Sequence, residues 1–183
     1  MTLLIIGTIL FFGIHFVPST PLKARCVEVY GATKYKLMFS LVSAVGLGLI
    51  IYGFSLTHFI PLFDPLPWGR DLVIYTMPVT VILLLASDLP NNIKRWVRHP
   101  MLLGLMMWGG THLLANGDLA STILFASFSL FAFLDIILVT QAGRYKEKEA
   151  VSGRWDVVVV LLGLAVYCLV FYFHGFLTGM PLM

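Results

Sequence analysis

Six stretches of almost unbroken apolar sequence dominate the chain, and short polar segments separate them. Such runs of about 20 residues are what a bilayer crossing requires, and these runs are apolar on every side. Pro78 lies inside the third run and is expected to bend it. The pattern predicts an all-α, polytopic transmembrane helix bundle in a single domain, residues 1–183, with about six spans: residues 2–17, 37–58, 71–87, 100–115, 119–140 and 156–177.

A short connection joins the fourth and fifth runs. Asn116, Gly117 and Asp118 are typical of a tight turn, so these two helices are expected to form an antiparallel hairpin. Asp118 is also a suitable N-cap for the fifth helix, because its carboxylate can accept from the first free backbone N–H groups.

Composition supports the membrane interpretation. Apolar residues make up 59% of the chain and charged residues 11%, whereas a soluble domain is about one quarter charged. Cys26 and Cys168 form neither a disulfide framework nor a CxxC pair. The first apolar run begins directly after Met1 without a basic region or a small-residue cleavage site, so we expect a retained span rather than a signal peptide.

The basic residues predict the orientation. Eleven of the twelve lysines and arginines fall in the first, third and fifth loops, and only Arg70 lies in the second. By the positive-inside rule these loops are cytoplasmic, so both termini are expected on the non-cytoplasmic side. Orientation and anionic lipid account for the charge, and no nucleic-acid partner is expected. The eleven are Lys23, Arg25, Lys34, Lys36, Lys94, Arg95, Arg98, Arg144, Lys146, Lys148 and Arg154.

Two histidines lie at membrane depth. His15 is expected about 18 Å from the outer surface, and His112 falls in the outer half of the fourth span. His99 precedes His112 by 13 residues, which leaves them about 220° apart around the helix, so they form separate features. His58 and His174 are interpreted as interfacial residues.

Two interpretations remain open for His112 and for His15. Each can be an axial metal ligand or proton-transfer group, or it can simply hydrogen-bond to a neighbouring helix. Imidazoles from adjacent helices could reach one iron from its two sides. Gly104, Gly109 and Gly110 would allow a flat macrocycle to approach, although helix packing is the commoner role of a single glycine.

Polar residues at the inner ends of the fourth and fifth spans are further candidates, each taken separately. Arg98 and His99 precede Pro100 at a helix start, where a cation and an imidazole suit an anionic group; the alternative is an interfacial anchor. Asp135 lies in the inner part of the fifth span. An intramembrane carboxylate is a functional candidate by default, unless it reaches the interface.

Four segments together resemble the NnrU family of bacterial membrane proteins, which is named for denitrification gene clusters. The resemblance covers roughly residues 1–140 and extends to the plant and cyanobacterial 15-cis-zeta-carotene isomerases, which bind haem b. It rests on GIHFVPS (13–19), FSLVSAVGLGLIIYG (39–53), VRHPML (97–102) and THLLANGDLAS (111–121).

The resemblance implies a haem b whose iron is held by His15 and His112, in a bacterial inner membrane. In the carotene isomerases a cysteine three residues before the second ligand is thought to replace it on a change of redox state. That position is Gly109 here, which cannot coordinate iron.

A second, weaker similarity is to membrane isoprenylcysteine and phospholipid methyltransferases. RHPMLLG resembles their RHPxYxG string, which helps to bind S-adenosylmethionine, with Leu102 in place of the tyrosine. Their paired glutamates are matched only poorly, by Glu147 and Glu149.

The sequence thus favours a haem-b-binding inner-membrane protein that works on a lipophilic small molecule. Its expected activity is redox-gated cis–trans isomerisation of a polyene such as a carotenoid, or a role in denitrification and nitric-oxide metabolism. One alternative is an S-adenosylmethionine-dependent membrane methyltransferase with Arg98 and His99 at the cofactor carboxylate. Another is a non-catalytic haem sensor or assembly factor.

Overall fold

The computed structural model describes residues 1–143 and 148–180, which fold into α-helices and one short 3-10 helix. Three residues used above for the orientation and for the paired glutamates lie outside the described residues, namely Arg144, Lys146 and Glu147. The elements are α1 (Thr2–Phe16), η1 (Val17–Ser19), α2 (Leu22–Tyr30), α3 (Ala32–Ser55), α4 (Gly69–Asp88), α5 (Ile93–Trp96), α6 (Pro100–Ala115), α7 (Leu119–Gln141) and α8 (Arg154–Thr178).

In the part of the chain that the structure describes, five helices are long and apolar enough to cross a membrane, namely α1, α3, α4, α7 and α8, with α1 counted together with η1. The sixth expected span corresponds to α6, which has 16 residues and is therefore about 24 Å long, short of the ~30 Å hydrocarbon core. The count of six spans is therefore not established.

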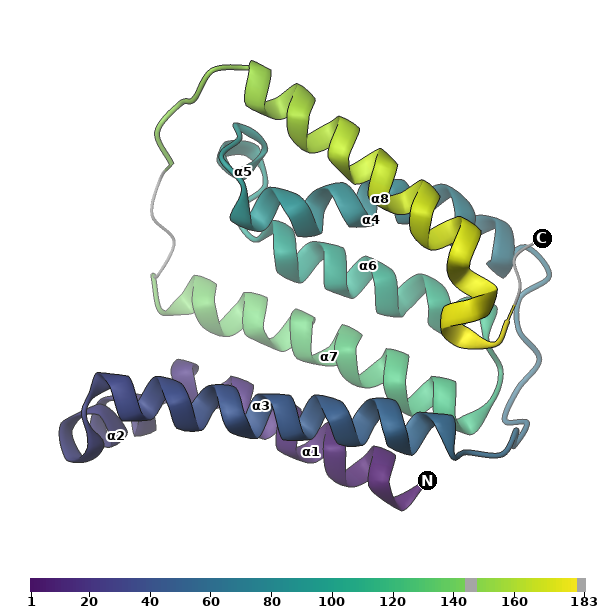
Figure 1. Cartoon of the computed structure of the whole chain (residues 1–183), viewed down its shortest axis with the longest axis horizontal. Coiled ribbons are helices and arrows are strands. Elements are labelled where there is room, and N and C mark those ends of the chain that lie inside the picture. Colours follow the sequence, from purple (N-terminus) through teal and green to yellow (C-terminus); the bar gives the residue numbers. More distant parts are fainter. Residues whose placement is uncertain (144–147, 181–183) are drawn as a thin grey trace.

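The helices form a chain of neighbours across the molecule. Helix α1 packs against α3, α7 lies beside α1 and α6, and α4 packs between α6 and α8. Figure 1 shows both termini at one end of the bundle and α2, α5 and the linker before α8 at the other. The predicted basic loops are thus gathered at one end, and their compartment stays a prediction.

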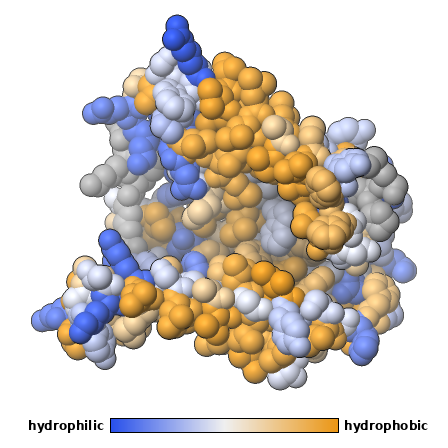
Figure 2. Space-filling view, viewed as in Figure 1, coloured by the Kyte–Doolittle hydropathy of each residue, from blue (hydrophilic) through white to orange (hydrophobic). Residues whose placement is uncertain are grey.

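The outer surface of the bundle is apolar. Figure 2 shows apolar residues over the middle of the long helices and hydrophilic residues towards the two ends. Ile9, Leu41 and Leu161 are each more than 60% exposed. Such side chains are stable in contact with lipid rather than water, which agrees with a multi-pass membrane protein.

Glycines bring α1 and α3 into close contact. A Cβ on Gly7 would lie 2.6 Å from the Ile50 nitrogen, and one on Gly46 would lie 2.9 Å from the Phe11 nitrogen. Gly48 faces away and would meet nothing within 4 Å. Small residues that let two backbones approach are a common way of joining helices in membranes, where apolar burial gives little driving force.

The segment between α3 and α4 folds over the α6–α7 turn. The Leu62 and Phe63 amides both donate to the Gly117 carbonyl, at 2.8 and 3.1 Å, and the Leu119 amide donates to the Ile60 carbonyl at 2.9 Å. The Asp118 carboxylate accepts from the Ser121 amide at 3.0 Å. The predicted tight turn and N-cap are therefore both confirmed.

Two asparagines organise the end of α4, and the second of them bonds to the start of α8. Asn91 is 2% exposed and donates to the Ala86 carbonyl at 2.8 Å. The Asn92 amide side chain donates to Asp156 at 2.7 Å and to the Val151 carbonyl at 2.9 Å. The Asn91 bond closes the end of α4, and the Asn92 bonds hold the start of α8 beside α5 through polar groups.

Candidate functional site

His15 lies in the last turn of α1 and is surrounded by aromatic rings. Its Nδ1 lies 2.6 Å from the Phe11 carbonyl oxygen; a carbonyl can only accept, so Nδ1 carries the proton and donates. The imidazole centroid lies 4.2 Å from Phe11, 5.2 Å from Phe39 and 5.9 Å from Phe131.

His112 lies in the last turn of α6 and repeats this arrangement. Its Nδ1 donates to the Trp108 carbonyl at 2.8 Å. The ring stacks on Phe125 of α7 at 4.8 Å and 29°, and it lies 5.5 Å from the Trp108 ring. Within residues 1–143 and 148–180, neither His15 nor His112 has a hydrogen-bond partner at Nε2.

Both histidines therefore present the same tautomer, with the proton on Nδ1 and the lone pair on Nε2. A backbone carbonyl that accepts from one ring nitrogen fixes the ring and leaves the other nitrogen as a metal ligand. The two positions also share a sequence feature. An aromatic residue precedes each membrane histidine by four positions, namely Phe11 and Trp108.

Aromatic side chains connect the two imidazoles. Phe128 of α7 lies 5.8 Å from Phe11 and 5.3 Å from Trp108, the rings that touch His15 and His112 respectively. The two imidazoles themselves share no ring contact in the part of the chain that the structure describes. They meet α7 at Phe131 and Phe125, six residues apart, which corresponds to about 9 Å along the helix axis.

Two hydroxyl groups on α3 are buried on the side of the bundle where His15 lies. Tyr35 and Ser43 stand one helical turn to either side of Phe39, the ring that contacts His15. Neither hydroxyl has a hydrogen-bond partner among the described residues. Buried polar groups are rarely left unsatisfied, so their orphaned oxygens suit a ligand that carries polar substituents.

The candidate metal ligands are two separate imidazoles rather than a cluster. A haem iron takes one or two protein ligands, because the macrocycle supplies the other four. The described residues hold no group of three or more histidine, cysteine or acidic side chains that could bind a bare metal ion. His15 and His112, with Nε2 unbonded among the described residues and set among phenylalanine and tryptophan rings, are candidate single ligands of this kind.

The glycines of α6 have packing roles. A Cβ on Gly109 would lie 2.6 Å from the Phe125 carbonyl oxygen, and one on Gly104 would lie 3.2 Å from the Thr80 carbonyl oxygen. These glycines bring α6 against α7 and α4. Gly110 is less restricted, since its Cβ would meet only Ser129, at 4.0 Å. The packing interpretation is the one that the structure supports for Gly104 and Gly109.

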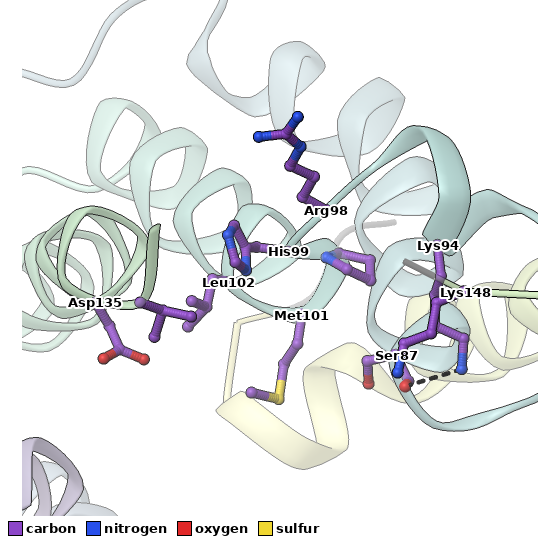
Figure 3. A pocket seen from close by; sticks show the side chains of 10 residues that line it. Ser87, Lys94, Arg98, His99, Met101, Leu102, Asp135 and Lys148 are labelled. Atoms are coloured by element: carbon purple, nitrogen blue, oxygen red, sulfur yellow. Dashed lines mark hydrogen bonds between the residues drawn. The ribbon is translucent and has the colours of Figure 1, made fainter. Parts of the chain in front are cut away.

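A second candidate site is a cavity of about 410 Å³ at the end of the bundle that carries α5 (Figure 3). We call it the basic cavity because four of its lining residues are Lys94, Arg98, His99 and Lys148. Pro100, as predicted, opens α6 directly after His99. The His99 Nε2 lies 3.2 Å from the Thr140 hydroxyl of α7.

Asp135 lines the same cavity from α7. It accepts a hydrogen bond of 3.1 Å from Ser19, so η1 and α7 are joined at this level. His58 is exposed beyond the end of α3, and His174 donates through Nδ1 to the Met180 carbonyl at 2.7 Å. Of the residues singled out from the sequence, Arg98, His99 and Asp135 thus share one cavity, and His15 and His112 share one aromatic cluster.

These features define a polytopic helical membrane protein with a histidine-containing aromatic cluster and a separate basic cavity. The sequence profile described as NnrU protein matches residues 3–182. The chain therefore belongs to the NnrU family, and the match extends through α8, beyond the 1–140 expected from the motifs. The comparisons with curated proteins and with solved structures each gave no match.

Proposed function

We propose that this protein binds haem b within the membrane and that His15 and His112 are its axial ligands. The observation that carries this proposal is the shared tautomer of the two imidazoles, since both point their protonated Nδ1 at their own helix and leave Nε2 unbonded among the described residues. The aromatic rings around them suit the flat apolar faces of a porphyrin.

Haem, when bound, supplies an iron that changes oxidation state and can exchange an axial ligand. The protein's own groups position the two imidazoles. The Phe11 and Trp108 carbonyls hold each imidazole in one tautomer, and the ring of Phe125 fixes the plane of His112 by stacking. The Tyr35 and Ser43 hydroxyls are free to accept or donate bonds to polar substituents.

We assign a lipophilic polyene as the substrate class and cis–trans isomerisation as the activity. Support comes from the similarity to carotene isomerases and from the position of both histidines, which are half-buried in helices whose outer faces are apolar. A substrate dissolved in the bilayer can therefore reach this region without passing through water. Gly109 stands where the carotene isomerases carry the cysteine, so that residue would not take part in ligand exchange here.

Haem loading of the purified protein tests the proposal. The protein is expressed with ample haem supply, solubilised in a neutral detergent, and its haem-to-protein ratio is measured by absorption. We expect a Soret band that corresponds to about one haem per chain. The band should be lost or strongly reduced in His112→Ala and in His15→Ala. His58→Ala is the matched control and should retain the band, since His58 is exposed and lies outside the aromatic cluster. A colourless protein with intact folding would overturn the proposal.

A further inference from the structure

We propose that the segment between α3 and α4, residues 57–68, lies in the membrane interface, where its apolar side chains contact lipid. We call this segment the α3–α4 loop. The inference does not depend on haem binding, because the loop and the aromatic cluster around the two histidines use different residues. Figure 1 shows the loop crossing the end of the bundle that carries both termini, beside the ends of α6 and α7 that it bonds to.

The side chains of the α3–α4 loop are apolar although the segment forms no helix. Asp64 is its only permanently charged residue, and it contains no lysine or arginine. An exposed apolar patch marks a surface that contacts lipid or another protein. Six large apolar side chains of the loop are each at least 38% exposed, namely Phe59, Ile60, Leu62, Phe63, Leu66 and Trp68.

This patch continues the lipid-facing surface of the helices, which is the reason to assign it to lipid. Ile51 in α3 is 63% exposed, Leu56 directly after α3 is 52% exposed, and Phe59 in the loop is 71% exposed. Trp68, at the far end of the loop, is 54% exposed, and tryptophan is enriched where the membrane meets water. The bilayer that covers the helices can therefore cover the loop as well.

The short helix α6 leaves room for the loop within the thickness of the membrane. Its 16 residues span about 24 Å, which is roughly 6 Å less than the ~30 Å hydrocarbon core. The α6–α7 turn can therefore end below the membrane surface, where unpaired backbone groups are costly. The loop supplies partners for this turn. Its Leu66 amide donates to the Leu114 carbonyl at 3.0 Å, in addition to the two bonds to the Gly117 carbonyl described above.

The backbone of the loop is adapted to the same place. Pro61, Pro65 and Pro67 have no N–H, so they add no donors that would need a partner in a region with little water. Gly117 allows the loop to lie directly on the turn, since a Cβ there would collide with the Phe63 carbonyl oxygen. The loop is thus bonded to the turn through its backbone and presents apolar side chains outwards.

Spin labels test where the loop lies. Phe59→Cys, Leu62→Cys and Asp64→Cys are made singly in a chain without its two native cysteines, and Leu161→Cys, on the 62% exposed face of α8, is the lipid reference. Each labelled chain is reconstituted in vesicles of phosphatidylethanolamine and phosphatidylglycerol. Collisions of the label with oxygen, which concentrates in lipid, are compared with collisions with a water-soluble nickel chelate.

We expect the oxygen-to-nickel collision ratio at Phe59→Cys and Leu62→Cys to approach that at Leu161→Cys, and the ratio at Asp64→Cys to be clearly lower. Ratios at the first two positions as low as at Asp64→Cys would place the loop in water and overturn the proposal. Protection of both positions from both reagents would also overturn it, because a protein partner or a second copy of the chain would then cover the loop.

A variant of the turn tests the contact that holds the loop. Gly117→Ala should push against Phe63, so the Leu62→Cys label should become more mobile and its collisions with nickel should rise. Gly110→Ala is the matched control in the same hairpin, because its Cβ would meet only Ser129, at 4.0 Å. Similar unfolding temperatures of the two variants would exclude general misfolding. An unchanged label in Gly117→Ala would overturn the contact on which the proposal rests.

Discussion

His15 and His112 are held by the backbone of their own helices. A buried imidazole in a membrane needs at least one partner, and here the partner is the carbonyl of the aromatic residue one turn earlier. The same geometry therefore satisfies one nitrogen, orients the ring and places an aromatic side chain against it. A histidine that only joined two helices would instead use a group on the neighbouring helix, and no such bond is found for either residue in the described segments.

Pro78 leaves one backbone carbonyl of α4 without its usual helical hydrogen bond. Proline has no N–H, so the carbonyl of Ile74, four residues earlier, loses its helical partner. The Tyr167 hydroxyl of α8 donates to that carbonyl at 3.0 Å. Helix α4 continues through Pro78, and the repair comes from another helix, as is common in membranes.

Tyr167→Phe should therefore destabilise the protein by about 1 kcal/mol. In a Pro78→Ala background the same change should cost clearly less, because residue 78 then has an N–H to offer to Ile74. Both free energies can be measured by unfolding in a denaturing detergent. An identical effect of Tyr167→Phe in the two backgrounds would show that the hydroxyl has no connection with the proline.

Asp118 is the clearest single capping residue. It is 6% exposed, and its carboxylate accepts from the Ser121 amide at 3.0 Å at the start of α7. Asp118→Ala should lower the stability by about 1–2 kcal/mol, whereas Asp118→Asn should retain most of it, because asparagine caps helices equally well. Comparison of the unfolding midpoints checks this, and a large loss in the asparagine variant would indicate that the charge matters rather than the cap.

Among the helices, α1 and α3 are joined by close backbone approach rather than by large side chains. Gly46→Val should separate them and cost about 1–3 kcal/mol, since its Cβ would press on the backbone of Phe11. Gly48→Val is the matched control, two residues away on the open face, and should be tolerated. The thermal stability of the two variants in detergent gives the comparison, and equal losses would contradict the assigned interface.

The hydrophobic pattern predicted the long helices because a bilayer crossing needs a continuous apolar run. It did not predict α2 or α5, which are short, polar and stabilised mainly by their neighbours. It also placed the start of the second span at residue 37, whereas α3 begins at Ala32. Polar residues such as Lys34 and Lys36 can extend a helix beyond the membrane, and they add nothing to the apolar run from which the span was predicted.

At the scale of the whole molecule, α2, α5 and the linker before α8 lie at the end of the bundle opposite to the termini, and most of the lysines and arginines belong to these segments and their flanks. The orientation is testable with single cysteines after replacement of Cys26 and Cys168. A membrane-impermeant maleimide should label Asp64→Cys in intact bacterial cells, and it should label Ser152→Cys only after the membrane is opened. Labelling of Ser152→Cys in intact cells would contradict the positive-inside prediction.

The candidate sites were predictable in part. His15, His112, Arg98, His99 and Asp135 stood out because each is a polar residue in or beside an apolar run. The resemblance already paired His15 with His112, whereas the cavity shared by Arg98, His99 and Asp135 was not visible, because it depends on which helices are neighbours. Phe128 of α7 contacts both Phe11 beside His15 and Trp108 beside His112, and Lys148 reaches the basic cavity from a linker about 50 residues away from Arg98 in the sequence.

Electron paramagnetic resonance of the oxidised, haem-loaded protein is the most direct test of the central proposal. Two imidazoles on one ferric haem give a low-spin signal, which we predict for the unaltered chain and for His58→Ala. His15→Ala and His112→Ala should each lose that signal, either through haem loss or through conversion to a high-spin form. A low-spin signal that survives both substitutions unchanged would show that the iron is held elsewhere.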